Sequence, residues 1–204
     1  MKSTIYLASR SPRRRELLKQ LGVVFQLFQM REDLRRGTDV DETPKPGESP
    51  ADYVLRIART KAETAAHYIE RRTFSQRWPA LAADTTVVLE GRIIGKPLTT
   101  QDAQRTLAEL AGRKHEVITA VAIAFNGRVE AATSTSTVWF GEMSAEYIKR
   151  YVALGESLDK AGGYSIQGRA AAFVARIEGS YSGIMGLPLA ETADLLARSG
   201  NEVL

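Results

Sequence analysis

The sequence has no cysteine, and only two of its 204 residues, His67 and His115, are histidines. Disulfides and thiolate metal sites are therefore excluded, and a metal centre built from several histidines is disfavoured. Any metal would be held by carboxylate oxygens, which favours Mg²⁺ or Mn²⁺. The absence of cysteine also suits a reducing compartment, and we expect a cytoplasmic protein.

Long apolar runs are missing as well. No stretch approaches the roughly 20 apolar residues of a membrane-spanning helix, and the N-terminus lacks the apolar core of a secretory signal. We therefore expect no membrane association. The hydrophobic content of 44% and charged content of 25% are ordinary for a globular protein. The net charge of +4 suits a polyanionic ligand, whether small or large.

The stretch 5–22 predicts a strand, a tight turn and a helix. Residues 5–8 form a short apolar run, Ser11 stands where an N-cap belongs, and Pro12 occupies the first helical position. The turn places hydroxyl groups and free backbone N–H groups at the positive end of the helix dipole. Arginines at 13–15 add bidentate donors suited to phosphate. These features predict an anion site, with a basic, solvated helix start as the alternative.

The rest of the chain alternates between helical and extended patterns. We expect helices over 50–69, 99–112, 144–155 and 188–200, strands over 23–28, 81–89, 92–94, 115–125, 129–140 and 171–177, and irregular segments over 29–49 and 157–169. Asn126-Gly127, between the two longest strands, is a strong type I′ hairpin signal. No repeat or linker interrupts the pattern. The order predicts an α/β fold with a mixed sheet rather than a doubly wound one.

Several polar residues do not fit their surroundings. Asp84 interrupts an apolar strand, and a carboxylate in such a place is usually functional or ion-paired. Lys96 lies between a glycine and a proline, which suggests a positioned cation. Lys61 lies at the edge of an apolar helix stripe, where lysine more often snorkels than acts. Asp41 and Glu42, in the long loop, are either a second acidic group or a solvated pair.

Gln167 lies in a glycine-rich segment, residues 159–168. Its amide carries a donor and an acceptor side by side, so it can pair with the edge of a nucleobase. The glycines themselves do not form a standard phosphate-loop pattern. The alternative is that Gln167 only ties down its own loop.

Six separated motifs, taken in order, resemble the Maf family of nucleoside triphosphate pyrophosphatases. They are L-A-S with S-P-R-R in 7–14, R-I-A with K-A in 56–62, A-D-T in 83–85, G-K-P in 95–97, D-K-A-G with I-Q-G in 159–168, and G-S-Y with G-L-P in 179–188. The resemblance covers nearly the whole chain. It implies hydrolysis of a nucleoside triphosphate between its α- and β-phosphates, which gives a monophosphate and pyrophosphate.

The same resemblance implies one domain over residues 1–204, with two lobes around a long mixed β-sheet, flanking helices and a central cleft. It also implies a divalent metal cation, Mg²⁺ or Mn²⁺, and a homodimer. Y-S-I-Q at 164–167 resembles the branch that acts on dTTP and UTP rather than the branch that acts on 7-methyl-GTP.

Carried over position by position, the resemblance assigns Asp84 as the general base and Glu42 as the second acidic group, and both as metal ligands. The positions expected to bind substrate are Ser9, Arg13, Arg14, Lys61, Thr85, Lys96 and Gln167. Of these, Arg13, Thr85 and Gln167 match the positions that set the choice of base.

This sequence departs from the family pattern in three places. Ala83 and Ser165 stand where glycine is usual, and residues 30–39 form a longer segment than usual. The longer segment leaves Asp41 as an alternative to Glu42.

Other functions fit parts of the sequence. A nucleic-acid-binding protein that uses the arginine cluster would explain the basic pI but not Asp84 or the glycine-rich segment, so we expect no nucleic-acid partner. A nucleotide-binding regulator of septum formation without catalysis is a further alternative, as is a pyrophosphatase for another modified nucleotide. Asp84 and Glu42 favour catalysis, because binding alone needs no poised base.

Overall fold

The computed structural model describes residues 4–30, 32–33, 37–71, 77–201 and 203. The strands are β1 (Thr4–Leu7), β2 (Val24–Leu27), β3 (Glu32–Asp33), β4 (Gly37–Thr38), β5 (Ala80–Leu89), β6 (Arg92–Ile94), β7 (Lys114–Phe125), β8 (Arg128–Phe140) and β9 (Val174–Glu178). The α-helices are α1 (Pro12–Gln20), α2 (Pro50–Arg71), α3 (Thr100–Leu110), α4 (Ala145–Ala153), α5 (Tyr181–Met185) and α6 (Leu189–Arg198). Two short 3₁₀ helices, η1 (Ala161–Gly163) and η2 (Arg169–Phe173), precede β9.

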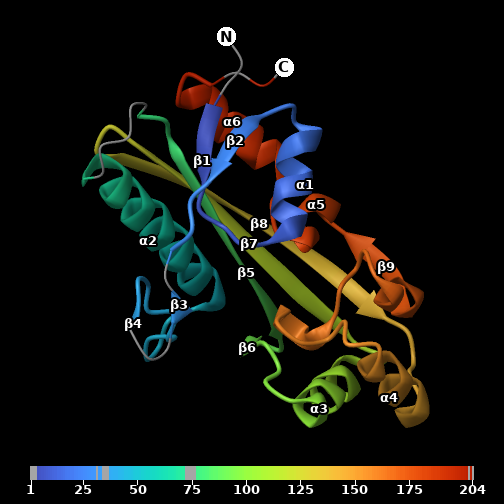
Figure 1. The fold of residues 1–204 in the computed structure, drawn as a ribbon. Helices are drawn as coiled ribbons and strands as arrows, with labels where there is room; N and C mark the ends of the chain where they lie inside the picture. The colour runs from blue at the N-terminus through green and yellow to red at the C-terminus, as the bar shows by residue number, and fades with distance from the viewer. Residues whose placement is uncertain (1–3, 31, 34–36, 72–76, 202, 204) are drawn as a thin grey trace.

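A seven-stranded mixed sheet forms the centre of the molecule (Figure 1). Its order is β2-β1-β5-β7-β8-β9, and β6 pairs with β5. β1 runs parallel to β2 and to β5, whereas the remaining pairs are antiparallel. The predicted α/β fold with a long mixed sheet is therefore confirmed. The division into two lobes stays a prediction.

Helices cover the sheet on both faces, because successive side chains of a strand point to opposite sides. Ala82 and Val88 of β5 pack in one apolar cluster with α2. Leu81, Ala83 and Val87 pack in the other cluster, with residues of α1, α3, α4, α5 and α6. Figure 1 shows α2 apart from this second group of helices. None of the helices in the described part of the chain combines the length and the apolar character needed to cross a bilayer.

The predicted helix starts are present. The Ser11 side chain accepts a hydrogen bond from the backbone N–H of Arg14. Thr99 and Asp102 form a reciprocal capping box at the start of α3. Ser144 caps α4 in the same way as Ser11 caps α1. These caps could be predicted from the sequence because each joins residues within four positions of one another.

The structure corrects the sequence-based boundaries in the last third of the chain. Residues 171–173, predicted as the start of a strand, belong to η2, and the strand begins at Val174. Ala170 and Phe173 are both buried, and their spacing of three suits a helical turn better than a strand. α5 was not predicted; Ser180 caps it, and Gly186, with φ 110°, ends it.

The long loop at 29–49 is also not wholly irregular, because β3 and β4 pair within it. Residues 31 and 34–36 of this predicted loop lie outside the described residues.

One stretch of β5 lies beside a gap in the sheet. β1 pairs with β5 only at Ala80 and Leu81, and β6 pairs with β5 from Val87 onward. Among the described residues, no strand pairs with residues 82–86 on that side of β5. Asp84 and Thr85 therefore lie at an opening where side chains from both faces of the sheet can meet.

Candidate active site

A cavity of about 990 Å³ occupies this opening. Its walls come from the turn after β1, the start of α1, the loop before α2, the middle of β5, the segment 159–166 and the end of α5. The volume falls in the upper part of the range typical of small-molecule sites, about 300–1,000 Å³. The cavity is lined by the sequence-predicted residues Ser9, Arg13, Arg14, Glu42, Lys61, Asp84, Thr85 and Lys96.

Lys61 of α2 joins the two predicted acidic residues. Its Nζ lies 2.7 Å from Oε1 of Glu42 and 2.8 Å from Oδ1 of Asp84. The Asp84 carboxylate is thus both largely buried and ion-paired, which satisfies a charge placed in an apolar strand. Lys61 does not snorkel to solvent, since its side chain is only 12% exposed.

The structure places Asp41 and Glu42 differently. Oδ1 of Asp41 accepts a hydrogen bond from the backbone N–H of Thr43 at 2.9 Å, and Asp41 is exposed. Glu42 instead extends to Lys61. Of the two acidic residues, Glu42 is the one whose carboxylate meets Asp84 through a shared cation.

Electrostatics keep the Glu42 carboxylate ionised. Burial alone would raise the pKa of Glu42, but the charges of Lys61, Lys96 and Arg14, together with the hydrogen bond from Lys61, more than offset it. The pKa of Glu42 is consequently lowered from its ordinary value. An ionised carboxylate at this point is available to bind a cation.

Arg14 ties three parts of the cavity together. Its Nε donates to the carbonyl oxygen of Gly186 at 2.7 Å, Nη1 to Oγ of Ser9 at 3.3 Å, and Nη2 to Oγ1 of Thr85 at 3.2 Å. Burial lowers the pKa of Arg14, partly offset by the negative charge of Asp84. Oγ1 of Thr85 also lies within hydrogen-bond distance, 2.9 Å, of Oγ1 of Thr119. The guanidinium therefore links the turn after β1 to β5 and to the end of α5.

Further cations border the cavity, among them Arg13, Lys96 and Lys160. Arg13 donates from Nε to the carbonyl oxygen of Met185 at 3.4 Å, and burial lowers its pKa. Lys96 is an exposed part of the wall. Lys160, which the sequence-based site did not include, also lines the cavity, and both burial and the charge of Arg13 lower its pKa. Its place in the D-K-A-G motif is the signal that could have found it.

Unlike the other residues predicted to bind substrate, Gln167 is not part of the cavity lining. Its side chain is exposed, and the cavity is lined by its neighbours Tyr164, Ser165 and Ile166. Behind this wall, Nε2 of buried His115 lies 2.8 Å from the Tyr164 hydroxyl. Burial lowers the pKa of His115 to about 4, so its imidazole is neutral near pH 7.

The acidic pair suits one kind of metal site. The described residues contain no group of three or more acidic or histidine side chains able to enclose a metal. Mg²⁺ usually binds one or two carboxylates together with substrate phosphates and water. Glu42 and Asp84, which meet at one lysine Nζ, fit that arrangement, in which the substrate supplies further oxygens.

A family model and curated relatives match almost the whole chain. A family model described as Maf-like protein matches residues 4–199. A dTTP/UTP pyrophosphatase of Nitrosomonas europaea is 53% identical over 199 residues, which are 98% of this chain and 96% of that protein. A protein of the same name from Cupriavidus metallidurans is 52% identical over 200 residues, 98% of each chain. A solved HAM1 protein from Coxiella burnetii has a TM-score of 0.43 and 17% identity, covering 69% of this chain and 74% of that one.

Proposed function

The chain belongs to the Maf family, and on that premise we propose that it is a nucleoside triphosphate pyrophosphatase that hydrolyses dTTP and UTP. The products are the nucleoside monophosphate and pyrophosphate. Relatives about half identical to this chain over nearly their full length are named dTTP/UTP pyrophosphatases. They support the choice of substrate.

The observation that carries the proposal is the meeting of Glu42, Lys61 and Asp84 at one wall of a cavity bordered by arginine and lysine. Phosphoryl chemistry depends mainly on charge neutralisation and on a positioned water. The cations of the cavity suit the first requirement. A buried carboxylate beside them suits the second.

In the reaction we propose, Asp84 acts as the general base. It takes a proton from a water molecule, whose oxygen forms a bond to the α-phosphorus. The bond from the α-phosphorus to the α–β bridging oxygen breaks, and its electron pair leaves with the pyrophosphate group. Lys61, 2.8 Å from Asp84, holds the carboxylate in place and offsets its charge next to a polyanionic substrate.

We assign the triphosphate contacts to Arg13, Arg14, Lys61 and Lys96, with Ser9 in the turn that follows β1. Arg14 can serve both the fold and the ligand. A guanidinium has five N–H donors, and three of those of Arg14 donate to protein oxygens, which leaves two.

A divalent cation, Mg²⁺ or Mn²⁺, would be held by Glu42 and Asp84 together with phosphate oxygens. When bound, it would supply Lewis-acid stabilisation of the charge that develops on those oxygens. Lys61 would then have to share the two carboxylates with the metal.

We further propose that Arg13, Thr85 and Gln167 set the choice of base. Arg13 and Thr85 line the cavity. Gln167 is exposed, but its two preceding neighbours line the wall, so a change in the bend at 166–168 would bring its amide inward.

We also propose that the protein is a homodimer and that it is cytoplasmic. Sedimentation of the purified protein tests the first, and cell fractionation tests the second.

The decisive experiment measures pyrophosphate release from dTTP, UTP, CTP, GTP and 7-methyl-GTP, with and without Mg²⁺. We expect release from dTTP and UTP that depends on the metal. Preference for CTP or GTP would contradict the substrate assignment. Nucleotide binding without any release of pyrophosphate would instead favour a regulator that does not catalyse the reaction.

A further inference from the structure

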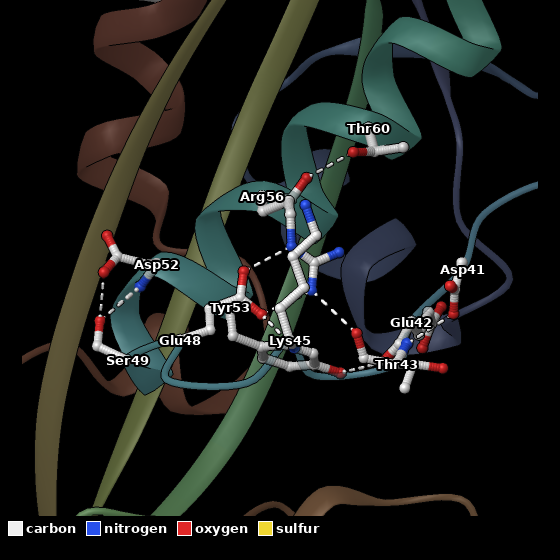
Figure 2. A network of polar contacts seen from close by, with 10 residues as sticks. All are labelled: Asp41, Glu42, Thr43, Lys45, Glu48, Ser49, Asp52, Tyr53, Arg56 and Thr60. Atoms are coloured by element: carbon white, nitrogen blue, oxygen red, sulfur yellow. Dashed lines mark hydrogen bonds and ion pairs between the residues drawn. The ribbon is translucent and has the colours of Figure 1, made fainter.

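The segment that carries Glu42 is fastened to α2 by side chains outside the proposed catalytic set (Figure 2). We call this segment, residues 41–48, the Glu42 loop. The Tyr53 hydroxyl donates to the backbone carbonyl of Glu42 at 3.1 Å. Nη2 of Arg56 donates to the backbone carbonyl of Thr43 at 3.1 Å. Two consecutive carbonyls, one of them that of Glu42, are therefore bound by one helix.

The same arginine also holds the far end of the Glu42 loop. Its Nε lies 2.5 Å from Oε1 of Glu48 and its Nη2 2.7 Å from Oε2, a bidentate pair. Oε2 of Glu48 in turn accepts from the backbone N–H of Lys45 at 3.0 Å. The Arg56 guanidinium also lies over the ring of Tyr53, 5.7 Å from its centroid. The two anchoring side chains thus support each other as well as the loop.

The ion pair at the tip of Glu42 is too weak to fix the loop by itself. The Glu42 side chain is 39% exposed, and partly exposed ion pairs contribute little because water screens them and ordering them costs entropy. The anchors are better placed, since the side chains of Arg56 and Glu48 are only 22% and 9% exposed.

The target of Glu42 lies on the same helix as its anchors. Lys61 follows Tyr53 by eight residues in α2, which is about 12 Å along a helix axis. We propose that Tyr53 and Arg56 are positioning residues that hold the Glu42 carboxylate against Lys61 and Asp84 by binding the backbone of the Glu42 loop. The proposal rests on the proposed function for the role of Glu42 itself.

The first test uses Tyr53→Phe, which removes one hydroxyl and changes no charge. We expect the Mg²⁺ concentration for half-maximal turnover of dTTP to rise about 2- to 10-fold, the range of one hydrogen bond. Arg56→Gln should raise it further, because Arg56 makes several contacts. The KM for dTTP at saturating Mg²⁺ should change less than the metal requirement. An unchanged metal requirement in both variants would overturn the proposal.

Ser49→Ala is the matched control. Oγ of Ser49 accepts from the backbone N–H of Asp52 at 3.1 Å and lies 2.6 Å from Oδ2 of the same residue, at the start of α2. Its loss should lower stability without touching the carbonyls of the Glu42 loop (Figure 2). We expect its metal requirement to match that of the wild type. An equal rise in Ser49→Ala and Tyr53→Phe would show a merely structural effect and overturn the proposal.

A double mutant sharpens the test. If Tyr53 acts through Glu42, then Tyr53→Phe should have little further effect on turnover or metal requirement in a Glu42→Gln background. If the fold-changes of the two single mutants instead multiply in the double mutant, the two residues act independently and the proposal is overturned.

Hydrogen exchange gives a readout that does not need activity. We expect the backbone N–H groups of Thr43 and Lys45 to exchange faster in Tyr53→Phe than in the wild type or in Ser49→Ala. If the wild type releases no pyrophosphate from dTTP or UTP, the proposed function fails. The comparison of exchange rates then tests the positioning role by itself. Equal exchange in the three proteins would then overturn the positioning role.

Discussion

Asp84 and Thr85 are neighbours in β5, yet their side chains bind partners on opposite faces of the sheet. Oδ1 of Asp84 lies 2.8 Å from Nζ of Lys61 in α2, whereas Oγ1 of Thr85 accepts from Arg14 of α1. Side chains normally alternate between faces that are kept apart by the sheet. Here the end of β1 leaves β5 open at this point, so both side chains border one cavity. The proposed base and a residue proposed to help set the choice of base can therefore lie side by side in the chain.

Replacing Asp84 by Asn should remove the proposed base while keeping the shape of the side chain. We expect turnover of dTTP to fall by roughly 10²-fold or more, the lower end of general-base contributions, with nucleotide binding largely kept. Steady-state kinetics and a binding isotherm measure the two effects. Glu63→Gln, on the exposed face of α2, is the control and should keep its activity. Near-normal turnover in Asp84→Asn would exclude it as the base.

Removing a cavity cation should weaken binding of the triphosphate more than binding of the nucleoside. For Arg13→Ala or Lys96→Ala, we expect the loss of about 1.5–3 kcal/mol in dTTP binding, the range for a hydrogen bond to a charged group. In Lys96→Ala, thymidine binding should change little, because Lys96 is assigned to the phosphates alone. Calorimetry with both ligands tests this, with exposed Arg105→Ala in α3 as the control. Equal losses for thymidine and dTTP in Lys96→Ala would refute the phosphate assignment.

Gln167 is predicted to distinguish uracil and thymine from cytosine. Its amide matches an imide edge, and one contact fails with cytosine, at a cost of about 1–3 kcal/mol. Gln167→Ala should therefore lose most of a roughly ten- to hundredfold preference for UTP over CTP. The neighbouring Arg169→Ala, also exposed, is the control. A preference that survives Gln167→Ala would leave base choice to other residues of the wall.

His115 should make the protein less stable in mild acid. Its pKa falls from 6.5 to about 4 in the folded protein because of burial, so between these values only the unfolded chain binds the proton. Stability should therefore fall as the pH drops from about 6.5 to about 4, by up to about 3 kcal/mol from this group. Urea unfolding at pH 7 and pH 5 measures the change. His115→Gln should show a smaller decrease; an equal decrease would mean that other groups cause it.

The sequence was informative wherever structure depends on near neighbours. The strand, turn and helix around Ser11 and the hairpin at Asn126-Gly127 follow from local capping and turn chemistry, and both are present. Asp84 was also identifiable, because a carboxylate inside an apolar strand needs a compensating partner. The partner itself was less obvious: Lys61 precedes Asp84 by 23 residues, and only the packing of α2 on β5 brings the two together.

The features that were not predicted from the sequence depend on contacts between distant segments. η2 and α5 are too short to show an apolar period, and each packs against segments distant in the chain. Phe173 of η2 contacts the rings of Phe140 and Tyr151, and α5 packs against β7 and β8. The exposure of Gln167 likewise follows from the path of the bend at 166–168, which local composition does not specify. The same is true of Tyr53, whose hydroxyl reaches a carbonyl eleven residues earlier.

The anchoring of the Glu42 loop has a consequence for how this region can diverge. Tyr53 and Arg56 bind backbone carbonyls, so they make no demand on which side chain follows Glu42. The anchoring contacts alone therefore leave the side chains of residues 43 and 44 free to vary, although both line the cavity. A single insertion between 42 and 48 would place a different residue opposite Tyr53 and turn the carboxylate away. Insertions before Val40 escape this constraint.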